Sequence, residues 1–191
     1  MANFTAAFTK TMGHEGGYAN NPLDTGGETY KGIARNFNPG WGGWHKVDQA
    51  KKQTGVVAQL DRLLSADKAL QLEVQKFYKL NYWDVNRLDL IDSQVLGDKL
   101  FDIGVNMGVK RAALMLQQAL NLTNVNGRAY RDIAEDGVIG PETLSLTDTH
   151  PRPALLLKVI NALQAERYLN IMRNNPTQET FANSWFSRVA F

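Results

Sequence analysis

The strongest constraint on the fold is a segment rich in glycine and proline, residues 18–48, which stands between two regions of helical periodicity. Pro22 and Pro39 fall in this segment together with repeated glycines, and both residue types interrupt regular secondary structure. We therefore expect turns and at most one small β-hairpin here, with no long helix. The helical patterns before and after it predict a mainly α protein.

The segment before it, residues 4–12, carries apolar side chains at the spacing of an amphipathic helix. Asn3 is a suitable N-cap, and Gly13, Gly16 and Gly17 predict the end of the helix. Glu15 then lies at the C-terminal end. The negative end of a helix dipole disfavours another negative charge, so this position favours the protonated form of a carboxyl group.

The rest of the chain is predicted to be mostly helical, with a second polar loop at residues 121–140. Gly104 and Gly108 predict a break between two helices before this loop, and Pro141 suits the first turn of the helix after it. Further helices are expected from about residue 57, from about residue 92, over 111–120, over 153–174 and near residue 185. We expect these helices to form two lobes around a cleft.

The composition is that of a folded, water-soluble protein, with 43% hydrophobic and 21% charged residues. The chain has no cysteine, which excludes disulfides and thiolate metal sites. Its net charge of +2 is small and its Lys and Arg residues are scattered, so we expect no nucleic-acid partner. The start of the sequence lacks a signal-peptide pattern, and no apolar run approaches the roughly 18 residues of a membrane span. We therefore expect synthesis in the cytoplasm and no stable membrane insertion.

Several kinds of catalytic site find no support in the sequence. His45 and His150 have no partner at metal-ligand spacing, and His14 is expected to be a structural hydrogen-bonding residue. The His-Glu-x-x-His pattern of zinc peptidases is absent, as are the Gly-x-Ser-x-Gly and phosphate-binding loop patterns. We expect neither a metal nor another cofactor.

One acidic residue among glycines, Glu15, is the leading catalytic candidate. Cleavage of a glycosidic bond needs a carboxylic acid that protonates the leaving oxygen, and a second group that activates water or stabilises positive charge at the sugar carbon. Asp24 follows nine residues later, after a proline turn, and is the first candidate for that second group; its alternative role is that of a turn residue. Glu28 in the same loop is the second candidate and a possible substrate-binding residue.

Aromatic residues of the irregular segment are candidates for sugar contacts. Tyr18, Tyr30 and Trp44 are the three that we expect at the substrate. The alternative for each ring is a purely structural place in the core beneath the loop, which is the more common role of large aromatic side chains.

The pattern around Glu15 resembles the signature of glycoside hydrolase family 108. The resemblance rests on Glu15-Gly16-Gly17-Tyr18, Asn21-Pro22, Asp24 and Gly26-Gly27-Glu28-Thr29-Tyr30-Lys31-Gly32-Ile33. The family consists of lysozyme-like N-acetylmuramidases of phage endolysins and bacterial proteins, some of them labelled secretion activators. The resemblance implies a lysozyme-like fold and cleavage between N-acetylmuramic acid and N-acetylglucosamine, with Glu15 as the acid. It also implies catalytic roles for Asp24 and Thr29, although Thr29 comes one residue earlier than the threonine of phage-type lysozymes.

The second half is similar to the peptidoglycan-binding region that accompanies this family. The similarity rests on residues 101–108, 116–120, 136–143 and 185–189, and Ser184 replaces a glycine that is common in the family. We therefore predict a catalytic region at residues 1–95 and a peptidoglycan-binding-like region at 96–191, packed into one compact unit. The segment 136–143 has two alternatives, a ligand-binding role and a packing role for Val138 and Ile139, and we favour packing.

The resemblance implies an enzyme that hydrolyses peptidoglycan glycan strands. The alternative is a protein that binds the cell wall without cutting it, in secretion or phage assembly. Because the expected target lies outside the cytoplasm, we expect a holin or a secretion system to release the protein, and we expect a monomer.

Overall fold

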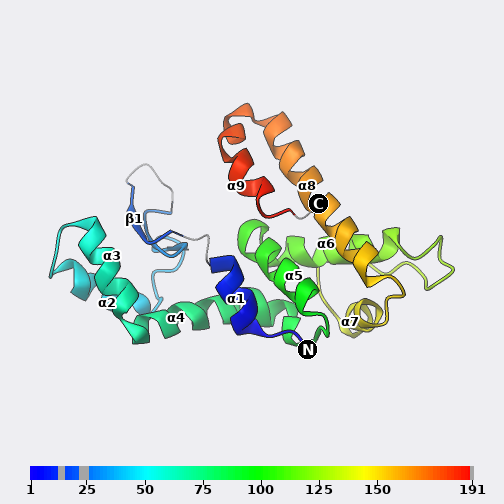
Figure 1. Cartoon of the computed structure of the whole chain (residues 1–191), viewed down its shortest axis with the longest axis horizontal. Helices are drawn as coiled ribbons and strands as arrows, with labels where there is room; N and C mark the ends of the chain where they lie inside the picture. The colour runs from blue at the N-terminus through cyan, green and yellow to red at the C-terminus, as the bar shows by residue number, and fades with distance from the viewer. Residues whose placement is uncertain (13–15, 22–25, 190–191) are drawn as a thin grey trace. The chain divides into compact units, whose positions relative to one another are not determined.

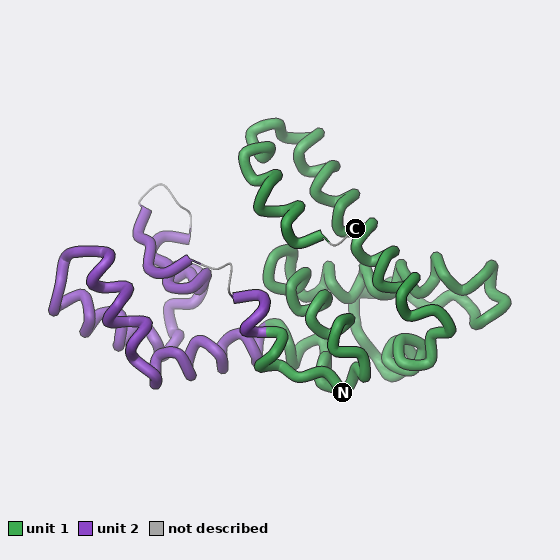
Figure 2. The backbone as a smooth tube through the Cα atoms, in the orientation of Figure 1, with its two compact units in different colours: residues 1–7, 82–191 green, residues 8–81 purple. Residues whose placement is uncertain are grey.

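The computed structural model describes residues 1–12, 16–21 and 26–189, and it is mainly α-helical with a small antiparallel sheet, which confirms the predicted fold class (Figure 1). The chain forms two compact units, one of residues 8–81 and one of residues 1–7 with 82–191 (Figure 2). No helix in the described residues is both long enough and apolar enough to cross a membrane.

The unit of residues 8–81 contains the sheet and the first helices. The helix α1, Phe4–Met12, begins in the other unit and ends in this one. The remaining elements of this unit are β1 (Tyr18–Asn20), β2 (Glu28–Tyr30), β3 (Ile33–Ala34), α2 (Gly43–Lys51), α3 (Val57–Ala66) and α4 (Lys68–Tyr78). Helix α4 buries Leu70, Val74 and Tyr78.

The sheet has three strands in the order β1-β2-β3, one strand more than the predicted hairpin. Tyr30 pairs with Tyr18 on one side and with Ile33 on the other. Lys31 and Gly32 form the tight turn between β2 and β3, with φ values of 45° and 75°. Two successive positive φ values are typical of the hairpin turn whose twist matches that of the strands. This turn allows Ile33 and Ala34 to pair with β2 as a short third strand.

The unit that includes residues 82–191 is helical in its described part. Its long helices are α5 (Gln94–Met107), α6 (Val109–Leu122) and α8 (Pro153–Asn174), and α6 packs against both α5 and α8. Shorter elements are the π-turn Lys79–Trp83, which spans the unit boundary, the 3-10 turns Asp84–Asn86, Leu88–Leu90 and Pro176–Phe181, and the helices α7 (Pro141–Asp148) and α9 (Ala182–Phe186).

The helix ends follow local signals. Asn3 caps α1 by accepting a hydrogen bond from Ala6 N at 3.0 Å, and Ser93 caps α5 in the same way. Gly108, at a φ of 94°, separates α5 from α6, whereas Gly104 lies inside α5 and forms no break. The prediction of a break was therefore right at Gly108 and wrong at Gly104, because only Gly108 adopts a backbone conformation that a helix excludes.

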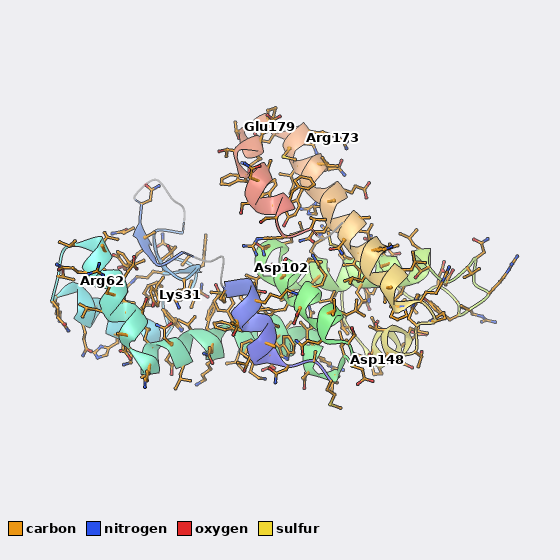
Figure 3. All side chains as sticks on the ribbon, in the orientation of Figure 1. Lys31, Arg62, Asp102, Asp148, Arg173 and Glu179 are labelled. Carbon is orange, nitrogen blue, oxygen red and sulfur yellow. The ribbon has the colours of Figure 1, made fainter. Side chains whose placement is uncertain are left out.

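The N-terminal and C-terminal segments both pack against α5. Phe4 meets the rings of Trp83 and Phe101 edge to face, with ring centroids 5.7 and 5.8 Å away. Near the other end of the chain, Arg188 Nη1 donates to Asp102 Oδ1 at 2.8 Å (Figure 3). The predicted motif at residues 101–108 thus anchors both segments.

The predicted packing of residues 136–143 is half confirmed. Ile139 is buried, but the side chain of Val138 is 63% exposed. The backbone is held instead by Gln117, whose Nε2 donates to Asp136 Oδ1 and to Val138 O. These bonds fix the main chain at Val138, while its side chain lies in solvent.

Candidate active site

Two predicted catalytic residues, Glu15 and Asp24, lie outside the described residues, as does His14. In the sequence, α1 and β1 flank Glu15, and β1 and β2 flank Asp24. Helix α3 packs against β1, and α2 packs against α3. This frame contains the other predicted site residues, Tyr18, Glu28, Thr29, Tyr30 and Trp44.

Glu28 on β2 is the centre of a charged network. Its Oε1 accepts hydrogen bonds from Tyr18 Oη at 2.7 Å and from Lys51 Nζ at 2.6 Å. Its Oε2 lies 2.6 Å from Arg35 Nε, and only 11% of the side chain is exposed. Both oxygens of this carboxylate therefore have cationic or hydroxyl partners from within the same unit.

The network sets the ionisation of Glu28. Burial acts to raise the pKa of this carboxyl, but the hydrogen bonds from Lys51 and Tyr18 and the charge of Arg35 outweigh burial and lower it. The hydrogen bond to Glu28 in turn raises the pKa of Lys51. Glu28 is therefore a carboxylate near neutral pH, which excludes it as a donor of a catalytic proton.

Arg35 extends the network to the surface of Trp44. Its guanidinium binds both carboxylate oxygens of Asp48, at 2.6 and 3.2 Å, and lies 4.4 Å from the centre of a Trp44 ring. Trp44 is 4% exposed, and its Nε1 donates to Asn38 O at 2.7 Å. The ring therefore has a structural place beneath Arg35 and offers no open face to a sugar.

Tyr30 is also part of the core. Its side chain is fully buried, and its hydroxyl accepts a hydrogen bond from Gln71 Nε2 at 3.0 Å. Lys31, labelled in Figure 3, donates from Nζ to the same Gln71 side chain. The expected sugar contacts of Tyr30 and Trp44 are not supported by this burial, and the structural alternative fits both rings.

Thr29 lies on the opposite face of the sheet from its neighbours Glu28 and Tyr30, because side chains alternate along a strand. Its cross-strand partners are Ala19 and Ala34, and Thr29 is partly exposed. Ala19 is exposed and Ala34 is partly exposed, so solvent reaches this face of the strands. Its catalytic role stays a prediction.

Of the three aromatic residues predicted to contact the sugar, Tyr18 is the one that is not buried. Its backbone N donates to Asp61 Oδ1 at 2.6 Å, and this carboxylate lies so close to Gly17 that a Cβ at this position would clash with it. The glycine before Tyr18 therefore makes room for Asp61. This explains one glycine of the motif by packing.

Several residues of this frame were not predicted from the sequence as part of the site, namely Arg35, Asp48, Lys51, Asp61 and Gln71. They lie between 7 and 43 residues from their partners in the chain. In the sequence, only the charges of Arg35 and Lys51, which lie in or next to the irregular segment, indicate a role in the site. Among residues 1–12, 16–21 and 26–189, no group of three or more His, Asp and Glu side chains is placed to hold a metal ion.

Known proteins match this chain along most of its length. The family model described as glycosyl hydrolase 108 matches residues 8–108, and the one described as a predicted peptidoglycan domain matches residues 111–190. A solved structure of SagA from Brucella abortus is similar with a TM-score of 0.61 and 24% identity, over 97% of this chain and 88% of that one. Among curated proteins, none matches.

The first of these matches covers more than half of the chain and includes the whole motif from residue 15 to residue 33. The second indicates peptidoglycan as the ligand of the remaining part. The likeness to SagA shows a shared fold. This chain is a member of the glycosyl hydrolase 108 family.

Proposed function

We propose that this protein is an N-acetylmuramidase, which hydrolyses the bond between N-acetylmuramic acid and N-acetylglucosamine in peptidoglycan. The observation that carries the proposal is the family match over residues 8–108, within which Glu15 and Asp24 stand at the spacing of an acid and its partner. The peptidoglycan domain match over residues 111–190 supports the same substrate.

In this proposal Glu15 protonates the leaving oxygen of the glycosidic bond. Asp24 activates the attacking water or stabilises the positive charge that develops at the sugar carbon. Thr29, on the open face of β2, contributes a hydroxyl to the same chemistry. Tyr18 contacts the sugar through its ring.

Glu28 has a different role in this scheme. Its carboxylate is ionised and its oxygens are engaged by Tyr18, Lys51 and Arg35. A group held in this way positions its neighbours well, but it could reach a substrate only by breaking its ion pairs with Lys51 and Arg35. We assign Glu28 the task of fixing β1 and β2, the strands that precede and follow Asp24 in the sequence.

The wider setting follows from the same function. Residues 96–191 bind peptidoglycan and residues 1–95 cut it, in a monomer that a holin or a secretion system releases to the cell wall. The alternative function, binding to the wall without cleavage, is favoured by the peptidoglycan domain match alone.

The test is the Glu15→Gln variant, measured by release of new reducing ends from purified peptidoglycan. Loss of a catalytic acid lowers the rate by about 100-fold or more. Glu166→Gln is the matched control, because it makes the same chemical change at an exposed position of α8.

The two functions give opposite results in this assay. Hydrolysis by the parent protein and by Glu166→Gln, with loss in Glu15→Gln, supports the muramidase. Sedimentation with cell walls and no reducing ends from any of the three proteins would support the binding protein.

A further inference from the structure

A polar pocket lies in the loop between α6 and α7, the yellow-green loop of Figure 1. Its volume is about 400 Å³, within the range of sites for small ligands. The pocket is lined by Asn121, Asn124, Asn126, Gly127, Arg131 and Asp132. No aromatic ring lines it, which distinguishes it from a surface on which sugars stack.

Two of the lining side-chain amides, those of Asn124 and Asn121, are held in place by hydrogen bonds. Asn124 is 3% exposed; its Oδ1 accepts from Gly127 N at 3.0 Å and its Nδ2 donates to Asp132 Oδ1. Asn121 binds the backbone of Ile133 from both ends of its amide, each at 2.9 Å. These bonds hold both side-chain amides in place at the edge of the pocket.

The backbone of the loop is strained at the pocket. Val125, Asn126 and Gly127 have successive φ values of 60°, 56° and 75°. This conformation is unfavourable for a β-branched residue such as Val125. Strain of this kind persists where the surroundings hold it, and it concentrates at binding sites.

Two polar side chains of the pocket are exposed and have no polar partner among the described residues. Arg131 and Asn126 have no hydrogen bond or ion pair with any residue that the structure describes. The guanidinium is permanently charged, and its donors match the two oxygens of a carboxylate. Asp132, bonded to Asn124 through Oδ1, adds an acceptor for an N–H group beside that carboxylate.

We propose that this pocket binds a free carboxylate of the peptide stem of peptidoglycan, an inference that rests on the proposed function for its choice of ligand. Arg131 pairs with the carboxylate, and Asn126 and Asp132 bind the adjoining amide group. The glycan strand fits the pocket less well, since N-acetylglucosamine carries no charge for Arg131 and finds no ring to stack on.

The experiment is a calorimetric titration of the full chain with three soluble probes at about 0.15 M salt. The probes are a stem tetrapeptide with free carboxylates, the same peptide with its carboxylates amidated, and di-N-acetylchitobiose. The parent protein should bind the free peptide about tenfold more tightly than either other probe. Arg131→Gln should abolish this preference, because it removes the charge that reads the carboxylate.

Arg128→Gln is the matched control, since Arg128 is an exposed arginine of the same loop that does not line the pocket. It should retain the preference for the free peptide. The inference is overturned if the parent protein binds the free and amidated peptides alike, or if Arg128→Gln weakens binding as much as Arg131→Gln.

This result is independent of glycan hydrolysis, because none of the probes contains the bond that the muramidase cuts. Glu15→Gln should bind the free tetrapeptide as the parent protein does. Peptide binding without hydrolysis would therefore contradict the proposed function alone, and hydrolysis without peptide binding would contradict this inference alone.

Discussion

The hydroxyl of Tyr18 donates a 2.7 Å hydrogen bond to Glu28 Oε1, which links β1 to β2 across the sheet. The two strands precede and follow Asp24 in the sequence, so this bond ties together the ends of the segment that carries the proposed second catalytic group. Lys51 from α2 donates to the same oxygen and connects the strands to the helices.

Removing the Tyr18 hydroxyl should weaken this link without removing the ring. We expect Tyr18→Phe to lower the free energy of unfolding by about 1 kcal/mol, the usual net value of one hydrogen bond. Urea denaturation measures this loss. In the double variant with Glu28→Gln the two losses should be less than additive, because Tyr18→Phe removes the same hydrogen bond that Glu28→Gln weakens. Full additivity would show that the two side chains are not coupled.

The ionised state of Glu28 predicts how stability depends on pH. Its pKa is lower in the folded protein than the ordinary value of 4.5, so the unfolded chain binds more protons as the solution is acidified. The stabilisation is fully present above pH 4.5 and is lost as the pH falls through the lower folded value. Glu28→Gln should therefore cost about 2 kcal/mol at pH 7 and progressively less below pH 4.5.

Thermal unfolding of this variant and its parent between pH 3 and pH 7 provides the measurement. Glu166→Gln, at an exposed position on α8, is the control and should change stability little at any pH. A gap between Glu28→Gln and its parent that stays constant down to pH 3 would show that the carboxylate is not stabilised by its cations.

Trp44 offers a test between a structural and a sugar-binding role. Because the ring is 4% exposed and bonded to Asn38 O, we expect Trp44→Ala to cost about 3 to 5 kcal/mol of unfolding free energy. Phe37→Ala is the control, since Phe37 is 70% exposed and its loss should cost less than about 0.5 kcal/mol. The measurement is the denaturation midpoint of each variant in urea, compared with that of the parent protein. An unchanged midpoint for Trp44→Ala would reject the structural role.

The sequence predicted most of the helices because their signals are local, but it missed α2, Gly43–Lys51, which begins inside the segment expected to form only turns and a hairpin. The helix expected over 153–174 has the observed bounds Pro153–Asn174. Pro141 likewise stands in the first turn of α7, as predicted.

The frame of the site was harder to predict because its contacts join distant residues. Nothing near Tyr18 in the sequence indicates that Asp61 binds its backbone, or that Lys51 reaches Glu28. The burial of Tyr30 depends on strand pairing and on Gln71, which composition does not reveal. Local patterns thus identified the candidate acid Glu15, whereas tertiary packing determines which aromatic rings stay exposed.

The strained Val125 predicts a stabilising substitution. Its φ of 60° suits asparagine much better than a β-branched residue, so Val125→Asn should raise the free energy of unfolding by about 1 kcal/mol. Val138→Asn is the matched control, because Val138 is an exposed valine outside the left-handed region, and it should leave stability nearly unchanged. Thermal melting compares the two, and a lower melting temperature for Val125→Asn would contradict the strain.

The proposed muramidase activity requires that the protein cuts peptidoglycan on the reducing side of N-acetylmuramic acid. The direct measurement is digestion of purified peptidoglycan, borohydride reduction of the products and mass spectrometry of their sugar ends. We expect muraminitol at the new ends from the parent protein and none from Glu15→Gln. Glucosaminitol at the new ends, or no new ends from the parent protein, would contradict it.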